Sequence, residues 1–227
     1  MPLITSMYKG PQYGHTLTSH TAKSQPTVHG YCPTFFVMQQ EQSLEFGLRA
    51  SILRVGQVAG PVQKGGCWNR AEWLPSLIQT LKALGMIPAT LPDVNWIPVD
   101  IIADIVVDII HSPDAESPAT FNLVNPKPVP WASLVPTVQS WFGTEKVTVA
   151  PLHEWITALR SVDMGDANAV KAAPATKIGD FFEAIARSNA HSPKYTTIMG
   201  PAISKTMAEV GPVNPGWMYI WLSQWNF

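Results

Sequence analysis

Charge is scarce in this chain, and so are long apolar runs. Charged residues make up 14% of the 227 residues, and the formal net charge is −1 at pH 7. A nucleic-acid-binding surface needs clustered lysine and arginine, which this sequence does not contain. No run approaches the ~18 apolar residues of a membrane span, and residues 1–8 lack the pattern of a signal peptide. We therefore expect a soluble, cytoplasmic protein with neither a nucleic-acid nor a membrane partner.

Metal-ligand and disulfide patterns are equally scarce. The two cysteines, Cys32 and Cys67, form no CxxC pair, and the six histidines form no H-E-x-x-H motif. Asp104 and Asp108 lie four residues apart, a spacing that places both carboxylates on one helix face. This pair suggests either a metal site or a solvated acidic face, and we favour the solvated face. We expect free thiols, a reducing compartment and no metal.

Several enzyme motifs are also missing from the sequence. No G-x-G-x-x-G phosphate loop, Walker loop or nucleophile elbow occurs. The glycines that do cluster, Gly56 and Gly60, follow an apolar run at 50–53 and are typical of a turn at the end of a buried strand. The usual hydrolase and P-loop classes are therefore excluded.

The remaining pattern alternates short apolar runs with amphipathic segments, as in an α/β protein. Asp100 is placed to cap a helix, and Pro136 should either kink a helix or mark its true start. Asn125 and the residues up to Pro128 should form an exit loop after a strand. We expect strands at 50–53, 95–99, 120–124 and 147–150, and helices within 67–83, at 101–110, 131–142, 152–159 and 178–188, and after Pro215.

Four segments in a fixed order carry a family resemblance: 53–61, 94–110, 121–126 and the tryptophan-rich end at 217–227. From about residue 41 to 227 the chain resembles the thioester reductase domain of fungal nonribosomal-peptide-synthetase-like enzymes and carboxylic acid reductases. That domain belongs to the extended short-chain dehydrogenase/reductase superfamily. The resemblance implies an α/β fold, a truncated Rossmann-type parallel sheet with a mostly helical C-terminal substrate lobe. Residues 1–40 match poorly and read as a loose leader.

The family's chemistry is reduction of an acyl or peptidyl thioester with NADPH, which releases an aldehyde or an alcohol. The thioester is carried on the phosphopantetheine arm of an acyl or peptidyl carrier protein, so this resemblance implies NADPH as cofactor and a carrier protein as partner. Arg54, Val55, Gly56 and Gln57 match the family's segment beside the nicotinamide. A purely structural turn at the strand end is the alternative for these four residues.

Trp68 and Trp73 are the candidates for lining the substrate chamber, with plain core packing as the alternative. Glu72, between them in the sequence, is more easily explained as a solvated helix charge than as an acid catalyst.

The sequence departs from the family in its catalytic motif. The family uses Tyr-x-x-x-Lys; here Tyr31 is the candidate catalytic tyrosine, but Phe35 stands where the lysine should be. We expect no autonomous reductase activity. The chain is a fragment or degenerate member of the NADPH-dependent thioester reductases, for which an incomplete gene model is the favoured explanation. The alternatives are a non-catalytic module that binds a carrier protein or an acyl chain, and a pseudogene-like remnant without function.

Overall fold

The computed structural model describes residues 50–63, 65–115, 119–188 and 194–227. Tyr31 and the predicted leader at 1–40 lie outside these residues, so their assignments stay predictions. The chain divides into two compact units, one formed by Met1–Ile52 with Glu116–Thr120 and the other by Leu53–Ala115 with Phe121–Phe227. The second unit holds nearly all of the described residues, and the account below concerns it.

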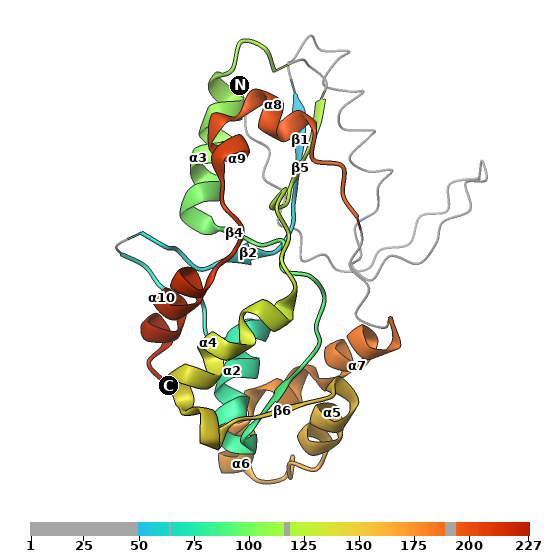
Figure 1. Ribbon diagram of the computed structural model, residues 1–227. Coiled ribbons are helices and arrows are strands. Elements are labelled where there is room, and N and C mark those ends of the chain that lie inside the picture. Colours follow the sequence, from blue (N-terminus) through green and yellow to red (C-terminus); the bar gives the residue numbers. More distant parts are fainter. Residues whose placement is uncertain (1–49, 64, 116–118, 189–193) are drawn as a thin grey trace, which may run out of the picture. The chain divides into compact units, whose positions relative to one another are not determined.

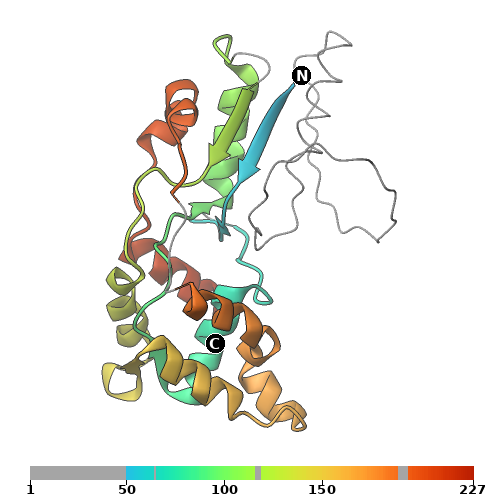
Figure 2. The ribbon, with the colours of Figure 1, turned by 90° about the vertical axis from the view of Figure 1, so that its right-hand side faces the viewer.

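The described residues form short pairs of strands, and the second and third of the pairs given below are parallel. Figure 2 shows the arrows of the first and fifth strands running in the same direction. In β5 (Ala119–Leu123) the side chains of Ala119, Phe121 and Leu123 are buried while the two between them are half-buried, the alternation expected for a strand. The pairs are β1 (Ser51–Val55) with β5 (Ala119–Leu123), β2 (Val58–Ala59) with β4 (Ile97–Pro98), and β3 (Met86–Pro88) with β6 (Thr148–Ala150).

Helices make up most of the rest of the described chain (Figure 1). They are α2 (Trp73–Leu84), α3 (Val99–His111), α4 (Val135–Phe142), α5 (Leu152–Arg160), α6 (Ala167–Ala172), α7 (Gly179–Arg187), α8 (Met199–Ile203), α9 (Lys205–Glu209) and α10 (Pro215–Trp225). The predicted α/β class is confirmed. The sequence analysis missed α6, α8 and α9 because helices of five or six residues contain too few turns to show an apolar repeat.

The predictions for Pro136 and Asp100 had different outcomes. Pro136 is the second residue of α4, so it marks the start of that helix as expected. The cap position predicted for Asp100 was wrong, because α3 begins at Val99 and Pro98 occupies the cap position. The Asp100 carboxylate still accepts from a first-turn N–H, that of Ile101 at 3.1 Å, and its other oxygen accepts from the backbone N–H groups of Val62 at 3.0 Å and Gln63 at 2.8 Å. It therefore anchors a distant loop to the start of α3.

A cluster of tryptophans forms part of the core. Trp68, Trp96, Trp221 and Trp225 are all at most 4% exposed. The Trp68 ring meets the Trp221 ring edge-on with centroids 5.1 Å apart, a favourable aromatic geometry. Both buried indoles of α10 find acceptors, since Trp221 Nε1 donates to the Gly60 carbonyl at 2.9 Å and Trp225 Nε1 to the Trp68 carbonyl at 3.2 Å. Trp221 and Trp225 therefore form the core-facing side of α10.

The helical lobe packs around α2, whose residues from Leu74 to Ile78 are buried. Thr80 Oγ1 accepts a hydrogen bond from the Ala175 N–H at 3.0 Å, which joins α2 to the short 3-10 turn at Pro174–Ile178. Trp131 is buried and donates its indole N–H to the Pro88 carbonyl at 2.8 Å, which attaches the start of the α4 region to β3. Each buried polar group in these contacts has a partner, as a stable core requires.

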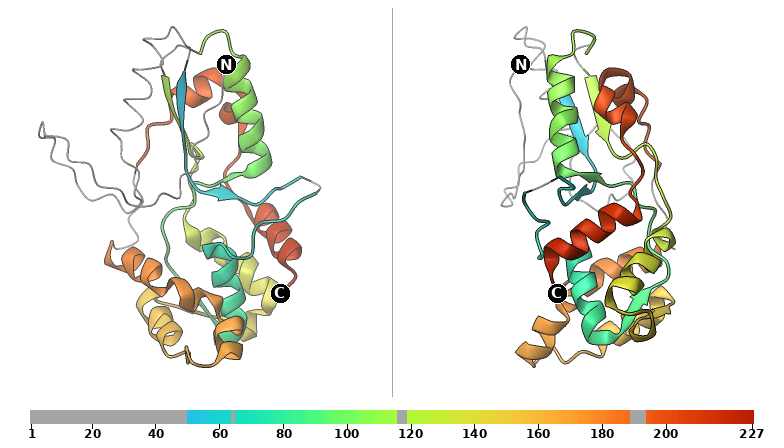
Figure 3. Two further views of the ribbon diagram at one scale, coloured as in Figure 1. Left: turned by 180° about the vertical axis from the view of Figure 1, so that it is seen from behind. Right: turned by 60° about the vertical axis from the view of Figure 1, so that its left-hand side comes forward.

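Asp108 on α3 ties the α8 and α9 segment to that helix, and both short helices lie against α3 (Figure 3). Its carboxylate accepts from the Ser204 hydroxyl at 2.7 Å and from the Thr206 N–H at 3.0 Å. Ser204 is fully buried and caps α9 by accepting from the Met207 N–H at 3.0 Å. The predicted solvated face is thus wrong for Asp108, because this carboxylate has partners far along the chain. Within the described residues no cluster of three metal-ligating side chains occurs.

Replacing Asp108 with asparagine is expected to destabilise the protein by about 1–2 kcal/mol at neutral pH, because a charged acceptor of two hydrogen bonds is lost. The hydrogen bond from Ser204, followed by that from Thr206, lowers the pKa of Asp108 below its ordinary value. A lowered pKa means that this stabilisation is complete above the ordinary aspartate pKa and is lost as the pH falls below it. Urea denaturation at a series of pH values should show the gap between the two proteins narrowing in acid.

The control is Asp104→Asn, one turn earlier on the exposed face of α3. It should change the stability by less than about 0.5 kcal/mol. A gap for Asp108→Asn that stays constant with pH would contradict the charged hydrogen-bond network.

The described helices include none that is both long and apolar enough to cross a bilayer.

Candidate functional site

A pocket of about 230 Å³ lies at the carboxyl ends of β1 and β5. The carboxyl ends of parallel strands in open α/β sheets are where such folds place their ligands. Three segments line it: the end of β1 with Gly56, the end of β5 with Val124, and a third segment just before α8. The lining residues are Arg54, Val55, Gly56, Asn122, Val124, Lys194, Tyr195 and Thr196.

Gly56 is required by the close approach of β1 and β5. Its N–H donates to the Leu123 carbonyl at 3.1 Å, which continues the strand pairing by one residue. A Cβ at this position would collide with Cγ1 of Val124, which is itself buried. The structural explanation of Gly56 considered above is therefore supported by packing, whether or not a cofactor also approaches this glycine.

Gln57 does not line the pocket but belongs to a hydrogen-bonded cluster behind it. Its Oε1 accepts from the Trp73 indole N–H at 2.8 Å, and its Nε2 donates to the Val58 carbonyl at 2.8 Å. The Glu72 carboxylate accepts from the Trp68 indole at 2.8 Å and, at a longer 3.4 Å, from Gln57 Nε2. Glu72 is half-buried, so the expectation of a solvated charge is wrong: it anchors the residue after Gly56 to the start of α2.

The two tryptophans predicted to line a substrate chamber differ in exposure. Trp68 is 3% exposed and belongs to the core cluster, so it offers a ligand little surface. Trp73 is half-buried and packs edge-on against Trp96 with ring centroids 5.5 Å apart. Neither ring lines the strand-end pocket. A chamber role for Trp68 and Trp73 stays a prediction.

The segment at 194–196 was missed by the sequence analysis. It follows the helical lobe in sequence and has no motif of its own, so only folding brings it to the strand ends. Asn122 holds it there, because Asn122 Nδ2 donates to the Thr196 carbonyl at 2.9 Å. The pocket thus combines two strand ends with a distant part of the chain.

The exit loop after β5 serves a structural purpose. Asn125 is 2% exposed and donates Nδ2 to the Gly211 carbonyl at 2.9 Å, while its Oδ1 accepts from the Lys127 N–H at 2.9 Å. Neither residue lines the strand-end pocket. This loop fastens the strand end to the segment before α10.

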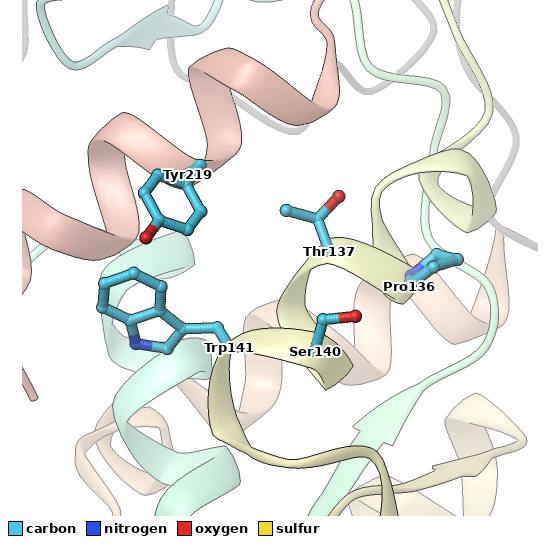
Figure 4. A pocket seen from close by; sticks show the side chains of 5 residues that line it. All are labelled: Pro136, Thr137, Ser140, Trp141 and Tyr219. Atoms are coloured by element: carbon cyan, nitrogen blue, oxygen red, sulfur yellow. The ribbon is translucent and has the colours of Figure 1, made fainter.

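A second pocket, of about 600 Å³, lies between α4 and α10 (Figure 4). Trp141 of α4 and Tyr219 of α10 pack edge-on against each other on one side of it, with ring centroids 5.0 Å apart. Pro136, Thr137 and Ser140 complete its lining. These side chains provide hydroxyls and rings but no charged group, so the strand-end pocket is the better candidate for chemistry.

The fold is that of a Rossmann-like reductase domain. The terminal reductase domain of the myxalamid polyketide and nonribosomal-peptide pathway superimposes with a TM-score of 0.60 at 21% identity, over 81% of this chain and 45% of that one. The thiolation-reductase di-domain of an archaeal nonribosomal peptide synthetase gives 0.57 at 15% identity, over 84% and 39%. No protein-family model matches the chain.

The sequence is also related to a named reductase. A carboxylic acid reductase of Neurospora crassa is 32% identical over 191 residues, which are 80% of this chain. The chain is therefore a homologue of that reductase, and its fold is that of terminal reductase domains, in agreement with the predicted resemblance. It spans 18% of the length of that relative.

Proposed function

We propose that the chain forms the substrate side of an NADPH-dependent thioester reductase, which releases a carrier-bound acyl chain as an aldehyde or alcohol. The homology to a carboxylic acid reductase over 80% of the chain is the observation that carries this proposal. The position of the pocket supports it, because it lies at parallel strand ends, where cofactor and substrate meet in such folds.

The cofactor would approach from the β1 side of this pocket. Arg54, Val55 and Gly56 line it there, and NADPH would supply the hydride. Gln57 would act indirectly, because its bonds to Trp73 and Glu72 hold the backbone that follows Gly56. The residues of the chain would position the acyl thioester beside the nicotinamide, which is the main contribution a protein makes to cofactor chemistry.

The proposed partner is an acyl or peptidyl carrier protein with a phosphopantetheine arm. The similar archaeal structure is a thiolation-reductase di-domain, which is consistent with such a partner. Such an arm carries its acyl group as a thioester at its free end, and this is the group that the proposed site must accept.

A binding measurement tests the proposed function. Octanoyl-pantetheine, a thioester without phosphate, is expected to change the tryptophan fluorescence of the purified chain saturably. The half-buried Trp73 lies next to Gln57 and would report this binding. NADPH is expected to leave the fluorescence unchanged, because the sequence contains no glycine-rich phosphate loop.

No response to octanoyl-pantetheine up to millimolar concentration would contradict the proposed function. Saturable quenching by micromolar NADPH would instead overturn the expectation that the chain lacks autonomous cofactor binding. Oxidation of NADPH at 340 nm, with an aldehyde product, would then assign the full reaction to this chain.

A further inference from the structure

The described lining of the strand-end pocket carries two positive charges and no negative charge. Arg54 and Lys194 are both exposed members of it, and the described residues of the lining include neither aspartate nor glutamate. The two cations come from different parts of the fold, one from β1 and one from the segment before α8. Their meeting at one pocket is a property of the tertiary structure.

Some basic residues of the described chain are paired with carboxylates, whereas Arg54 and Lys194 meet at one pocket without one. Arg160 on α5 binds Asp180 and Glu183 of α7, and Arg187 binds Glu183 one turn away. Within the described residues, no ion pair is recorded for Arg54 or Lys194. Two cations left without carboxylates at one pocket can pair with an anionic ligand.

The lining around the two cations is held in place. Asn122 ties the Thr196 carbonyl to β5 at 2.9 Å, two residues from Lys194. On the other side, the Gly56 N–H bond to Leu123 fixes the strand end two residues after Arg54. Backbone anchoring near both cations reduces the ordering cost of binding an anion between them.

We infer that Arg54 and Lys194 form a subsite for the phosphoryl group of a phosphate ester. This inference rests on the proposed function and names the part of the substrate that the pocket recognises. A volume of about 230 Å³ suits one phosphoryl group with a few adjoining atoms, and lies below the range of roughly 300–1,000 Å³ typical of whole-ligand pockets. The phosphoryl group belongs either to the phosphopantetheine arm or to the dinucleotide cofactor.

Isothermal titration calorimetry of the purified chain with two matched probes tests the inference. 4′-Phosphopantetheine and pantetheine differ only in the phosphate. The phosphorylated probe is expected to bind more tightly, and Arg54→Gln or Lys194→Gln should each weaken its binding roughly three- to tenfold. Pantetheine binding should be the same in all these proteins. Higher salt should reduce the advantage of the phosphate, since the cations are exposed.

Lys82→Gln is the matched control, because this exposed lysine lies in the last turn of α2 and does not line the pocket. It should bind both probes as the unchanged chain does. A third titration, with NADP⁺, identifies the source of the phosphoryl group. If Arg54→Gln and Lys194→Gln weaken the binding of NADP⁺ but not that of phosphopantetheine, the subsite is supported and belongs to the cofactor.

Equal binding of phosphopantetheine and pantetheine, with NADP⁺ unaffected by either substitution, would overturn the subsite. This result is separable from failure of the proposed function. If octanoyl-pantetheine still binds, the proposed function stands and only the phosphoryl subsite is lost. If octanoyl-pantetheine does not bind while phosphopantetheine does, the subsite stands and the acyl-thioester assignment fails.

Discussion

Replacing Trp221 with alanine is expected to lower the free energy of unfolding by about 3–5 kcal/mol, the usual cost of removing a large buried aromatic ring. Trp221 is fully buried and contacts Trp68, Trp96 and Trp217. Its loss would leave a cavity, and the Gly60 carbonyl would lose its indole donor. Denaturation in guanidinium chloride, followed by circular dichroism at 222 nm, measures the change.

Two further substitutions on α10 separate the contributions to this effect. Trp221→Phe keeps a ring but loses the hydrogen bond to Gly60, so its cost should be smaller than that of the alanine variant. Tyr219→Ala removes a ring that is 57% exposed on the same helix and should cost about 1 kcal/mol or less. A Trp221→Ala protein no less stable than Tyr219→Ala would show that the tryptophan cluster is not the core of this unit.

Replacing Gly56 with alanine is expected to cost about 1–3 kcal/mol, in the range of overpacked cores. The added Cβ would meet Cγ1 of Val124, so either the Val124 side chain or the strand end must move. Both residues line the strand-end pocket, so binding of octanoyl-pantetheine should weaken as well. Thermal denaturation and the fluorescence titration measure the two effects.

A second substitution tests whether this collision is the cause. Val124→Ala removes the clashing methyl groups, so the double variant Gly56→Ala with Val124→Ala should lose less stability than the sum of the two single changes. Gly211→Ala is the control, because a Cβ there would have nothing within 4 Å. Strict additivity of the two single effects would argue that Gly56 is needed for a reason other than room beside Val124.

Much of the fold could be predicted because its long elements repeat their own pattern. The apolar repeats of α2 and α3, and the proline that opens α4, place these helices from the sequence alone. The strand ending near Arg54 was found in the same way, from an apolar run followed by glycine. Local signals of this kind depend on neighbouring residues only. The proposed cofactor role of Arg54 to Gln57, and the role of Tyr31, stay predictions.

The site could be predicted only in part, because the lining residues at 194–196 have no signal in the sequence. Arg54, Val55 and Gly56 follow a recognisable strand, but Lys194 and Tyr195 belong to a segment without periodicity or motif. A hydrogen bond from Asn122 Nδ2 to the Thr196 carbonyl attaches that segment to β5. A bond between residues so far apart in the chain leaves no pattern within any short window.

The sequence by itself therefore determined the α/β class, the long helices and the relationship to reductases. Tertiary structure alone decided what the carboxylates do: Asp100 anchors a loop, Asp108 holds the start of α9, and Glu72 accepts from two side chains. It also brought Lys194 to the pocket that Arg54 lines. The physical reason is that periodicity reports how each element buries its own apolar face, whereas the partner of a polar group is chosen by proximity after the elements have packed.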